Sequence, residues 1–506
     1  MDPASNQMSQ WAQQNKDNSP ATLSAGQPVD NLTESMTVGP RGPIVLNDLV
    51  LINNLASFDR ERVPERVVHA KGSGAFGYFE VTTDYLAQFC RAKMFDKVGK
   101  RTPMLARFSQ VSLESGSADT VRDPRGFALK FYTEEGNWDM VGNNTPIFFI
   151  SDPMLFPSLI HVNKRNPVTH LKDPNMKWDF FSLRPESVHQ VTRLYHDLGT
   201  PDGWRHMDGF GSHTFKNVNS KGEAFFVKYH FRTDQGVKNL PAAKAAEIAG
   251  MDPDYATRDL FNAIAEGNCP SWTLYVQVAT PEQVKQFPFN PFDVTKVWSE
   301  EDYPLKEVGR FTLNKNPTNW HMDIESAAFN PGNLVPGIEP SPDKMLQARL
   351  FSYGDTQRYR LGPNHEQLPV NRPLNFPNPN YQKDGPQRVD NQDGKPNYFP
   401  NSFNGPGEAP SAAWDVNDTA SGNVARYPID TDHYWQCKAM WDQMTPDEQD
   451  RLTTNMAESV KMAAEPIRNR WYGVLEKVDK TYASQVHQKV DQAHKEGNIV
   501  GAVTLA

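Results

Sequence analysis

The stretch Arg349-Leu350-Phe351-Ser352-Tyr353 places a tyrosine four residues after an arginine. On a helix, residues i and i+4 share a face, so the Arg349 guanidinium can donate a hydrogen bond to the Tyr353 oxygen. A free tyrosine titrates near about 10, and a neighbouring cation or metal stabilises its anion. A phenolate is a hard ligand that suits ferric iron. The pair predicts either an iron ligand with its supporting guanidinium or an ordinary pair on a helix surface.

The composition describes a globular chain with an acidic balance. It has 506 residues, of which 38% are hydrophobic, and a formal net charge of -9. That size allows a large core, and the negative charge without any basic block argues against nucleic acid as a partner. We find no apolar run long enough to span a bilayer, so the sequence predicts no membrane partner.

Several features bear on the compartment. Cys90, Cys269 and Cys437 are too few and too scattered for a disulfide framework, which favours a reducing environment. The polar segment up to Asp30 lacks the apolar core of a secretory signal. We therefore predict an intracellular protein of the peroxisome or the cytoplasm, although residues 503–506 (Val-Thr-Leu-Ala) do not match the Ser-Lys-Leu type of peroxisomal signal.

Short β-rich runs recur between residues 77 and 313, and Asn219-Ser-Lys-Gly222 reads as a hairpin turn between two of them. Helical segments interrupt the runs, notably 185–198. This pattern predicts an α+β fold built on an antiparallel barrel with helical insertions. The expected strands are 78–82, 105–111, 127–132, 147–150, 215–218, 225–231, 272–278 and 308–313.

Composition also divides the chain into four regions. They are an N-terminal arm (1–68), a β-barrel domain (69–315), an irregular Pro- and Asn-rich segment that contains Tyr353 (316–431), and a C-terminal helical region (432–506). Amphipathic helices are expected at 435–444, 446–464 and 478–496. Gly72-Ser-Gly-Ala-Phe-Gly77 has the spacing of a dinucleotide-binding loop, but a strand follows it rather than a helix, so we reject that interpretation.

Four segments, taken in order, resemble the monofunctional haem catalases of the small-subunit, haem b type. The resemblance runs from about Asp59 to Gly362 and more loosely to Phe403. It implies the catalase fold, with an eight-stranded antiparallel barrel, an N-terminal arm, a wrapping loop and C-terminal helices, assembled as a homotetramer. The segments are Arg66-Val-Val-His69-Ala-Lys-Gly72, Ser115-Gly-Ser-Ala-Asp-Thr-Val-Arg-Asp-Pro-Arg-Gly126, Val141-Gly-Asn143-Asn-Thr-Pro146 and Arg349-Leu-Phe-Ser-Tyr-Gly-Asp-Thr-Gln-Arg-Tyr-Arg360.

The resemblance also implies a role for each matching residue. His69 matches the distal acid–base catalyst, Asn143 the distal amide, and Ser109 the hydroxyl that orients the histidine. Tyr353 matches the axial iron ligand, which is the established haem ligand of that family, and Arg349 matches its supporting group. Asp123 matches a carboxylate of the access channel. Arg66, Arg107 and Arg360 match the arginines that meet the haem propionates, and Val111, Phe148 and Phe156 match the apolar lining.

The implied activity is the disproportionation of hydrogen peroxide to water and dioxygen at a ferric haem, through a high-valent oxo-iron intermediate. Two other functions stay open. One is a fatty-acid hydroperoxide lyase of the allene oxide synthase type, in which threonine typically precedes the distal histidine, whereas Val68 does so here. The other is a haem-binding protein with a closed channel, against which intact His69, Asn143 and Tyr353 argue.

Some residues depart from the family pattern. Gln110, Gly354 and Gln357 stand where threonine, proline and histidine are usual, so their effect on the pocket is open.

Many catalases also bind NADPH, and His189, Trp298 and Arg232 are compatible with that site. Leu198, however, cannot pair with a 2′-phosphate, and Glu300 adds a like charge. We expect weak or absent NADPH binding, with Arg193 and His196 as the nearby groups able to compensate.

Overall fold

The computed structural model divides the chain into two units, residues 1–65 and 66–506. It describes residues 2–16, 19–414, 420–429 and 432–497. The terminal residues 503–506 considered above lie outside the described residues.

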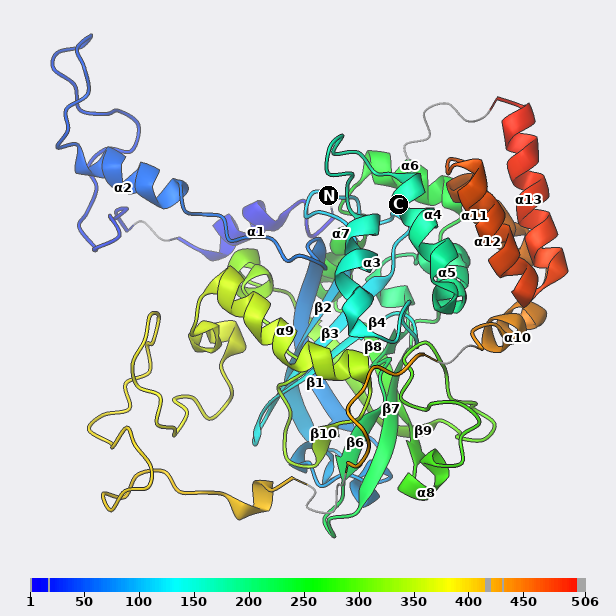
Figure 1. The fold of residues 1–506 in the computed structure, drawn as a ribbon. Helices are drawn as coiled ribbons and strands as arrows, with labels where there is room; N and C mark the ends of the chain where they lie inside the picture. The colour runs from blue at the N-terminus through cyan, green and yellow to red at the C-terminus, as the bar shows by residue number, and fades with distance from the viewer. Residues whose placement is uncertain (1, 17–18, 415–419, 430–431, 498–506) are drawn as a thin grey trace. The chain divides into compact units, whose positions relative to one another are not determined.

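An antiparallel β-barrel forms the centre of the second unit (Figure 1). Eight strands close the ring in the order β1-β2-β3-β4-β5-β7-β8-β9, because β9 pairs with β1 and β7 pairs with β8. Two short strands extend it, since β6 pairs with β7 and β10 with β6. The predicted eight-stranded antiparallel barrel is thus confirmed. The strands are β1 (Gly72–Val81), β2 (Arg101–Gln110), β3 (Arg125–Thr133), β4 (Gly136–Asn143), β5 (Gly209–Phe210), β6 (Phe215–Val218), β7 (Ala224–Thr233), β8 (Ser271–Ala279), β9 (Lys306–Lys315) and β10 (Ile338–Pro340).

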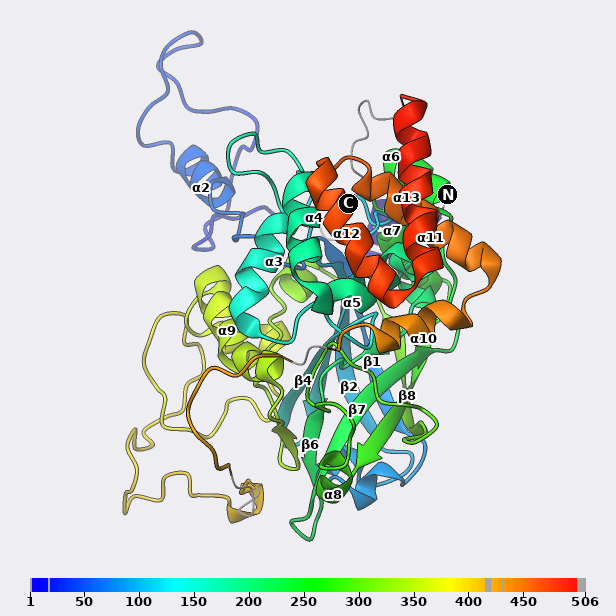
Figure 2. The ribbon, with the colours of Figure 1, turned by 45° about the vertical axis from the view of Figure 1, so that its right-hand side comes forward.

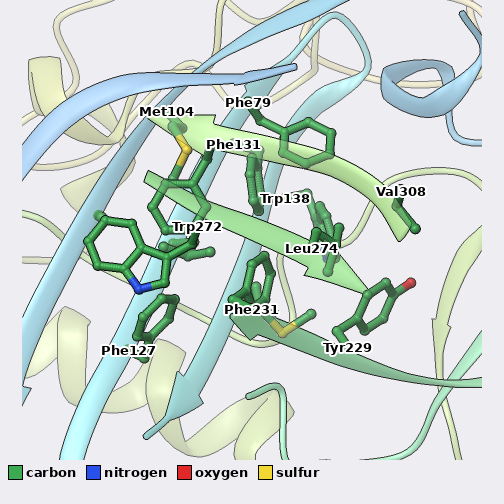
Figure 3. Close-up of a cluster of buried hydrophobic side chains, with 14 of the residues drawn as sticks. Phe79, Met104, Phe127, Phe131, Trp138, Tyr229, Phe231, Trp272, Leu274 and Val308 are labelled. Carbon is green, nitrogen blue, oxygen red and sulfur yellow. The ribbon is translucent and has the colours of Figure 1, made fainter. Parts of the chain in front are cut away.

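Alternating side chains give each barrel strand two different faces. In β3, Phe127 and Phe131 point into the barrel, where they belong to a large cluster of buried aromatic and aliphatic side chains (Figure 3). Residue Ala128 of the same strand belongs to a separate apolar cluster outside the barrel. The interior is therefore a filled core, and the outer face of β2, β3 and β4 is where a site can form.

One predicted strand is wrong, and the strands β4, β5 and β10 were missed. Residues 147–150 are not a strand: Ile150 packs in the helical core, and Phe148 N–H donates to the Val294 carbonyl at 2.9 Å. Packing against helices outweighed the β propensity of this apolar run. Strand β4 was missed because it contains Asp139, whose carboxylate is buried against Lys130 at 2.7 Å. The glycines at 72–77 lie inside β1, which agrees with rejecting a dinucleotide-binding loop.

Helices pack on one another to form a second core beside the barrel. In both views α11, α12 and α13 stand together next to α4 and α5 (Figures 1 and 2). Sequence analysis predicted three C-terminal helices and missed α12. Among the described residues, no helix combines the length and apolar character needed to cross a bilayer. The helices of this unit are α3 (Phe156–Asn163), α4 (Pro174–Leu183), α5 (Val188–Tyr195), α6 (Ala242–Met251), α7 (Tyr255–Ala265), α8 (Pro281–Val284), α9 (Lys344–Leu361), α10 (Trp435–Gln443), α11 (Pro446–Val460), α12 (Glu465–Val478) and α13 (Lys480–Lys495).

The first unit is an irregular segment with two helices, α1 (Gln7–Gln14) and α2 (Leu49–Phe58), neither of which has a buried residue. Asp48 caps α2 by accepting a hydrogen bond from Leu51 N–H at 3.0 Å. Exposed apolar side chains recur along α2 at Leu49, Ile52, Leu55 and Phe58.

The barrel core yields a stability prediction. Phe127 is fully buried and packs against Phe108, Phe231 and Trp272. Phe127→Ala should lower the free energy of unfolding by about 3–5 kcal/mol, because it opens a cavity among rigid aromatic side chains. Guanidinium-induced unfolding measures the change. Val168→Ala, at a side chain that is 90% exposed, is the control and should stay within about 0.5 kcal/mol. Equal effects of the two substitutions would contradict this description of the core.

Candidate functional site

Three neighbouring barrel strands present one row of residues on their outer face. Ser109 of β2 pairs with Gly126 of β3, and Gly126 pairs with Asn143 of β4. Partners in register across a sheet project to the same side. The hydroxyl of Ser109 and the amide of Asn143 therefore flank a position without a side chain.

His69 precedes β1 and places its ring over this gap. Its Nδ1 lies 2.9 Å from Ser109 Oγ, and its backbone N–H donates to the Val111 carbonyl at 3.0 Å. A Cβ added at Gly126 would lie 2.4 Å from His69 Nδ1 and 2.3 Å from Ser109 Oγ, so only glycine leaves room for the ring. His69 has a φ of 64°, a left-handed conformation that is uncommon for non-glycine residues. With Nδ1 engaged by Ser109, Nε2 is the nitrogen left for a ligand.

The electrostatic surroundings keep His69 neutral. Burial, followed by the positive charges of Arg107 and Arg349, lowers the pKa of His69 to about 3. At neutral pH the imidazole therefore has one protonated and one free nitrogen. Such a ring can accept a proton from one ligand atom and return it to another.

Helix α9 carries Arg349 and Tyr353, and Asp343 directly precedes its first residue. The Asp343 carboxylate accepts hydrogen bonds from Met345 N–H at 2.9 Å and Leu346 N–H at 3.2 Å, and so caps the helix. One turn apart on α9, Arg349 NH2 donates to the Tyr353 phenol oxygen at 2.9 Å. The same nitrogen donates to the Val141 carbonyl of β4 at 2.8 Å, which ties the helix to the barrel.

A chain of hydrogen bonds holds the Arg349 side chain in place. Arg349 NH1 lies 2.7 Å from His213 Nε2, and His213 Nδ1 lies 2.6 Å from the Asp343 carboxylate. Because a carboxylate can only accept, Nδ1 carries the proton and Nε2 accepts from Arg349. Burial lowers the pKa of His213 although Asp343 acts in the opposite direction. The chain Asp343–His213–Arg349–Tyr353 thus fixes the guanidinium that holds the phenol oxygen.

Three buried arginines gather around a single carboxylate near the site. Arg66 NH1 and Arg360 NH1 lie 3.2 and 3.3 Å from Glu325 Oε1, and Arg107 donates to the His69 and Ala70 carbonyls. Burial lowers the pKa of all three guanidinium groups, to about 9 for Arg360. The Nε of Arg107 is buried and has no partner among the described residues. This cluster has an excess of positive charge and an unmet donor, which suits an anionic group.

A cavity of about 480 Å³ lies between the row on the barrel and helix α9. The Phe148 and Phe156 rings stack with centroids 6.2 Å apart and form part of an apolar lining with Val111. Among the described residues none makes a hydrogen bond with the Asn143 side chain, so its amide is free to contact a ligand. His69, Asn143, Arg349 and Tyr353, predicted from distant parts of the sequence, all line this cavity.

The three unusual residues lie outside the cavity. Gln110 accepts a hydrogen bond from Ser117 Oγ at 2.5 Å and belongs to the face of β2 opposite Ser109. Gln357 Oε1 accepts from Arg360 at 3.0 Å and helps to hold that arginine. Gly354 is buried on α9.

Sequence analysis missed His213 and Asp343 as members of the site. Asp343 carries a detectable signal, because an aspartate after Ser341-Pro342 is typical of a helix start. His213 carries none, since only the fold brings it between Asp343 and Arg349.

Comparison with known proteins gives a consistent result over nearly the whole chain. Residues 22–405 match the family model Catalase, and residues 428–490 match the model Catalase-related immune-responsive. The chain is 55% identical to Catalase of Cavia porcellus over 98% of this chain and 94% of the relative. It is 56% identical to Peroxisomal catalase of Toxoplasma gondii over 93% and 94%. The structure of Catalase A from Saccharomyces cerevisiae, at 44% identity, matches with a TM-score of 0.90 over 93% of this chain and 99% of that one.

The gap at Gly126 can be tested directly. Gly126→Ala should displace the His69 ring and break its hydrogen bond to Ser109, because the added methyl would overlap both groups. A crystal structure of the variant measures the Nδ1–Oγ distance, which we expect to exceed 3.5 Å. Gly116→Ala is the matched control, since a Cβ there meets no atom within 4 Å. An unmoved His69 ring in Gly126→Ala would contradict the assigned geometry.

Proposed function

The chain belongs to the catalase family, and from this premise we propose that His69, Asn143 and Ser109 perform the acid–base chemistry of its reaction. The protein is a catalase, which converts hydrogen peroxide to water and dioxygen with haem as cofactor. The observation that carries the residue assignment is the cavity that His69, Asn143 and Tyr353 line together.

The residues of the cavity fit a haem. We propose haem b, with Tyr353 as the residue that would bind its iron. The phenol oxygen of Tyr353 accepts a hydrogen bond from Arg349 at 2.9 Å, which holds that oxygen in place. The unmet Arg107 Nε, beside Arg66 and Arg360, suits the carboxylates of the haem propionates. Val111, Phe148 and Phe156 supply an apolar wall for the macrocycle.

When bound, the haem supplies the iron that binds peroxide and exchanges two electrons with it. The chain supplies the proton transfer. We propose that His69 Nε2 takes the proton from one peroxide oxygen and returns it to the other, so that water rather than hydroxide leaves. Ser109 holds Nδ1 and thereby keeps Nε2 facing the substrate.

Asn143 has a positioning role in this proposal. Its amide can donate to the outer peroxide oxygen and hold it within reach of His69. The apolar lining favours a small substrate, because it offers a bulky reductant few polar contacts.

The catalytic role of His69 predicts a large loss on substitution. His69→Ala should reduce oxygen release from hydrogen peroxide by about 10²- to 10⁴-fold, because the variant has no group to move the proton. The haem content, measured by absorbance, should stay unchanged. His487→Ala, an exposed residue of α13, serves as the control and should keep full activity. Oxygen release by His69→Ala at close to the wild-type rate would show that another group moves the proton.

We also propose that the protein is a homotetramer in which the N-terminal arm contacts other subunits. Within the arm, Leu49, Ile52, Leu55 and Phe58 leave one side of α2 apolar and exposed, and a second copy of the chain is a suitable cover.

Sedimentation equilibrium tests the assembly. A mass near four chains is expected, because an irregular arm with little internal core needs a partner surface to become ordered. A stable monomer that retains haem would contradict the proposal.

For the compartment, we propose the peroxisome or the cytoplasm. The peroxisomal location printed in the name of the Toxoplasma gondii relative supports the first.

We propose that NADPH binds weakly or not at all. His189, Trp298 and Arg232 line one large hollow together with Glu300. Arg232 is already engaged on both sides, by Glu300 at 2.9 Å and by Asp208 at 2.9 Å. Leu198 lines an adjoining hollow and provides no cation there. Of the two groups able to compensate, Arg193 donates to His189 at 3.1 Å.

Calorimetric titration tests the nucleotide proposal. Wild-type protein should show no tight NADPH binding, because two carboxylates neutralise Arg232 and repel a phosphate. Glu300→Gln should strengthen binding by about twofold to fivefold, since the carboxylate it removes is 58% exposed and solvent screens its repulsion of a phosphate. Recovery of near-stoichiometric NADPH from the purified wild-type protein would show that other residues have rebuilt the pocket.

A further inference from the structure

A fully buried ion pair lies on the outer face of the barrel. Lys130 of β3 and Asp139 of β4 are register partners, and Lys130 Nζ lies 2.7 and 2.8 Å from the two carboxylate oxygens. Their side chains are 1% and 0% exposed. Burying two charges costs free energy, and an apolar pair of similar volume is often as stable. Stability alone therefore does not explain why this position holds an ion pair.

The carboxylate of Asp139 also binds a loop that precedes helix α9, which we call the 330–333 loop. Asp139 Oδ2 accepts hydrogen bonds from Asn330 N–H at 2.9 Å and from Asn333 Nδ2 at 2.9 Å. In the opposite direction, Asp139 N–H donates to the Asn333 carbonyl at 3.0 Å. The buried carboxylate thus fixes the loop to the barrel, which an apolar side chain could not do.

The loop in turn lies against helix α9. A Cβ added at Gly332 would lie 3.0 Å from the Leu350 carbonyl oxygen. A Cβ added at Gly354 would lie 3.4 Å from Asn330 Nδ2. Gly354 directly follows Tyr353, and Leu350 precedes Tyr353 by three residues. The loop therefore supports α9 at the turn that carries the proposed iron ligand.

Strand β4 connects this support to the opposite side of the cavity. Asp139 and Asn143 are four residues apart on β4, so they project to the same face of the strand. Between them, the Val141 carbonyl accepts a hydrogen bond from Arg349 of α9 at 2.8 Å. The distance of α9 from β4 therefore sets how far Tyr353 lies from Asn143 across the cavity that both residues line.

We propose that Asp139 is a positioning residue for Tyr353, because it holds the 330–333 loop and the loop sets the distance of α9 from β4. Lys130 balances the charge of the buried carboxylate, which remains an acceptor for the two loop donors. Neither Lys130 nor Asp139 lines the cavity, so the pair acts only through the loop. This role rests on the proposed binding of iron by Tyr353.

Gly332→Ala tests the contact between the loop and α9. Gly332 is exposed, so the variant should fold normally, but its methyl group would press on the Leu350 carbonyl oxygen. In a crystal structure, the 2.8 Å distance from Arg349 NH2 to the Val141 oxygen should lengthen beyond about 3.2 Å, the usual limit of such a bond. The visible spectrum of the haem-loaded ferric protein should shift. Gly407→Ala, where a Cβ meets no atom within 4 Å, is the control and should change neither.

Lys130→Met/Asp139→Leu tests the buried pair itself. The double variant removes both charges together, so no buried charge is left unpaired, and the loop loses its acceptor. Haem should transfer to apomyoglobin about tenfold faster than from the wild type, because two hydrogen bonds to a charged group are lost. The visible spectrum should shift as in Gly332→Ala. Lys244→Met/Glu247→Leu removes an exposed pair and should leave the transfer rate and the spectrum unchanged.

An undisplaced α9 with a wild-type spectrum in Gly332→Ala would overturn the positioning role, and this result stands whether or not the double variant folds. A double variant with the wild-type spectrum and transfer rate would also overturn it. So would faster transfer accompanied only by a lower guanidinium midpoint, which would indicate general support of the fold. A displaced α9 with an unchanged spectrum would support the positioning of the helix and contradict Tyr353 as the iron ligand.

Discussion

The hydrogen bond from Arg349 to the Tyr353 oxygen is the interaction on which the rest of the proposed site depends. The Arg349 guanidinium donates to the Tyr353 oxygen at 2.9 Å and so fixes the position of that oxygen. The arginine is itself fixed by His213 and, through it, by Asp343. Because Asp343 also caps α9, one carboxylate sets both the start of the helix and the direction of its functional face.

The barrel provides the opposite side of the cavity through its register. Ser109, Gly126 and Asn143 are partners across three strands, so they lie in one row on the outer face. Ser109 contributes a hydroxyl, Gly126 has no side chain, and Asn143 contributes an amide. The absent side chain makes room for His69, whose left-handed backbone turns the ring onto Ser109. Strain of this kind persists only where the surroundings hold it, and here β1, β2 and β3 do so. The row formed by Ser109, Gly126 and Asn143 thus lies on the sheet, and His69 lies shortly before β1.

Sequence patterns predicted the parts of the fold that depend on local rules. Phe127 and Phe131 alternate with polar or small residues, so the inward face of β3 could be predicted. Strand β4 could not, because the buried Asp139 is paired with Lys130 of the neighbouring strand and accepts hydrogen bonds from Asn330 and Asn333, which lie far away in the sequence. Residues 147–150 were predicted to form a strand because they are apolar, but they pack in the helical core. An apolar run can be buried against helices as well as within a sheet.

The same contrast holds for the site. His69, Asn143 and Tyr353 came from a resemblance, and the structure brings them to one cavity. His213 had no local signal, because its function arises from two partners more than a hundred residues away. The positive φ of His69 and the need for glycine at 126 are likewise properties of the assembled sheet, which the local sequence does not encode.

We propose that Tyr353, held by Arg349, is the iron ligand. The absorption spectrum of the purified ferric protein tests this most directly in Tyr353→Phe, with Tyr359→Phe as the control. Tyr359 lies on the same helix and is 78% exposed, so removing its hydroxyl should leave the spectrum and haem content as in the wild type. Tyr353→Phe should lose haem or show a changed spectrum, because the phenolate is gone. An unchanged spectrum with full haem content in Tyr353→Phe would contradict the claim.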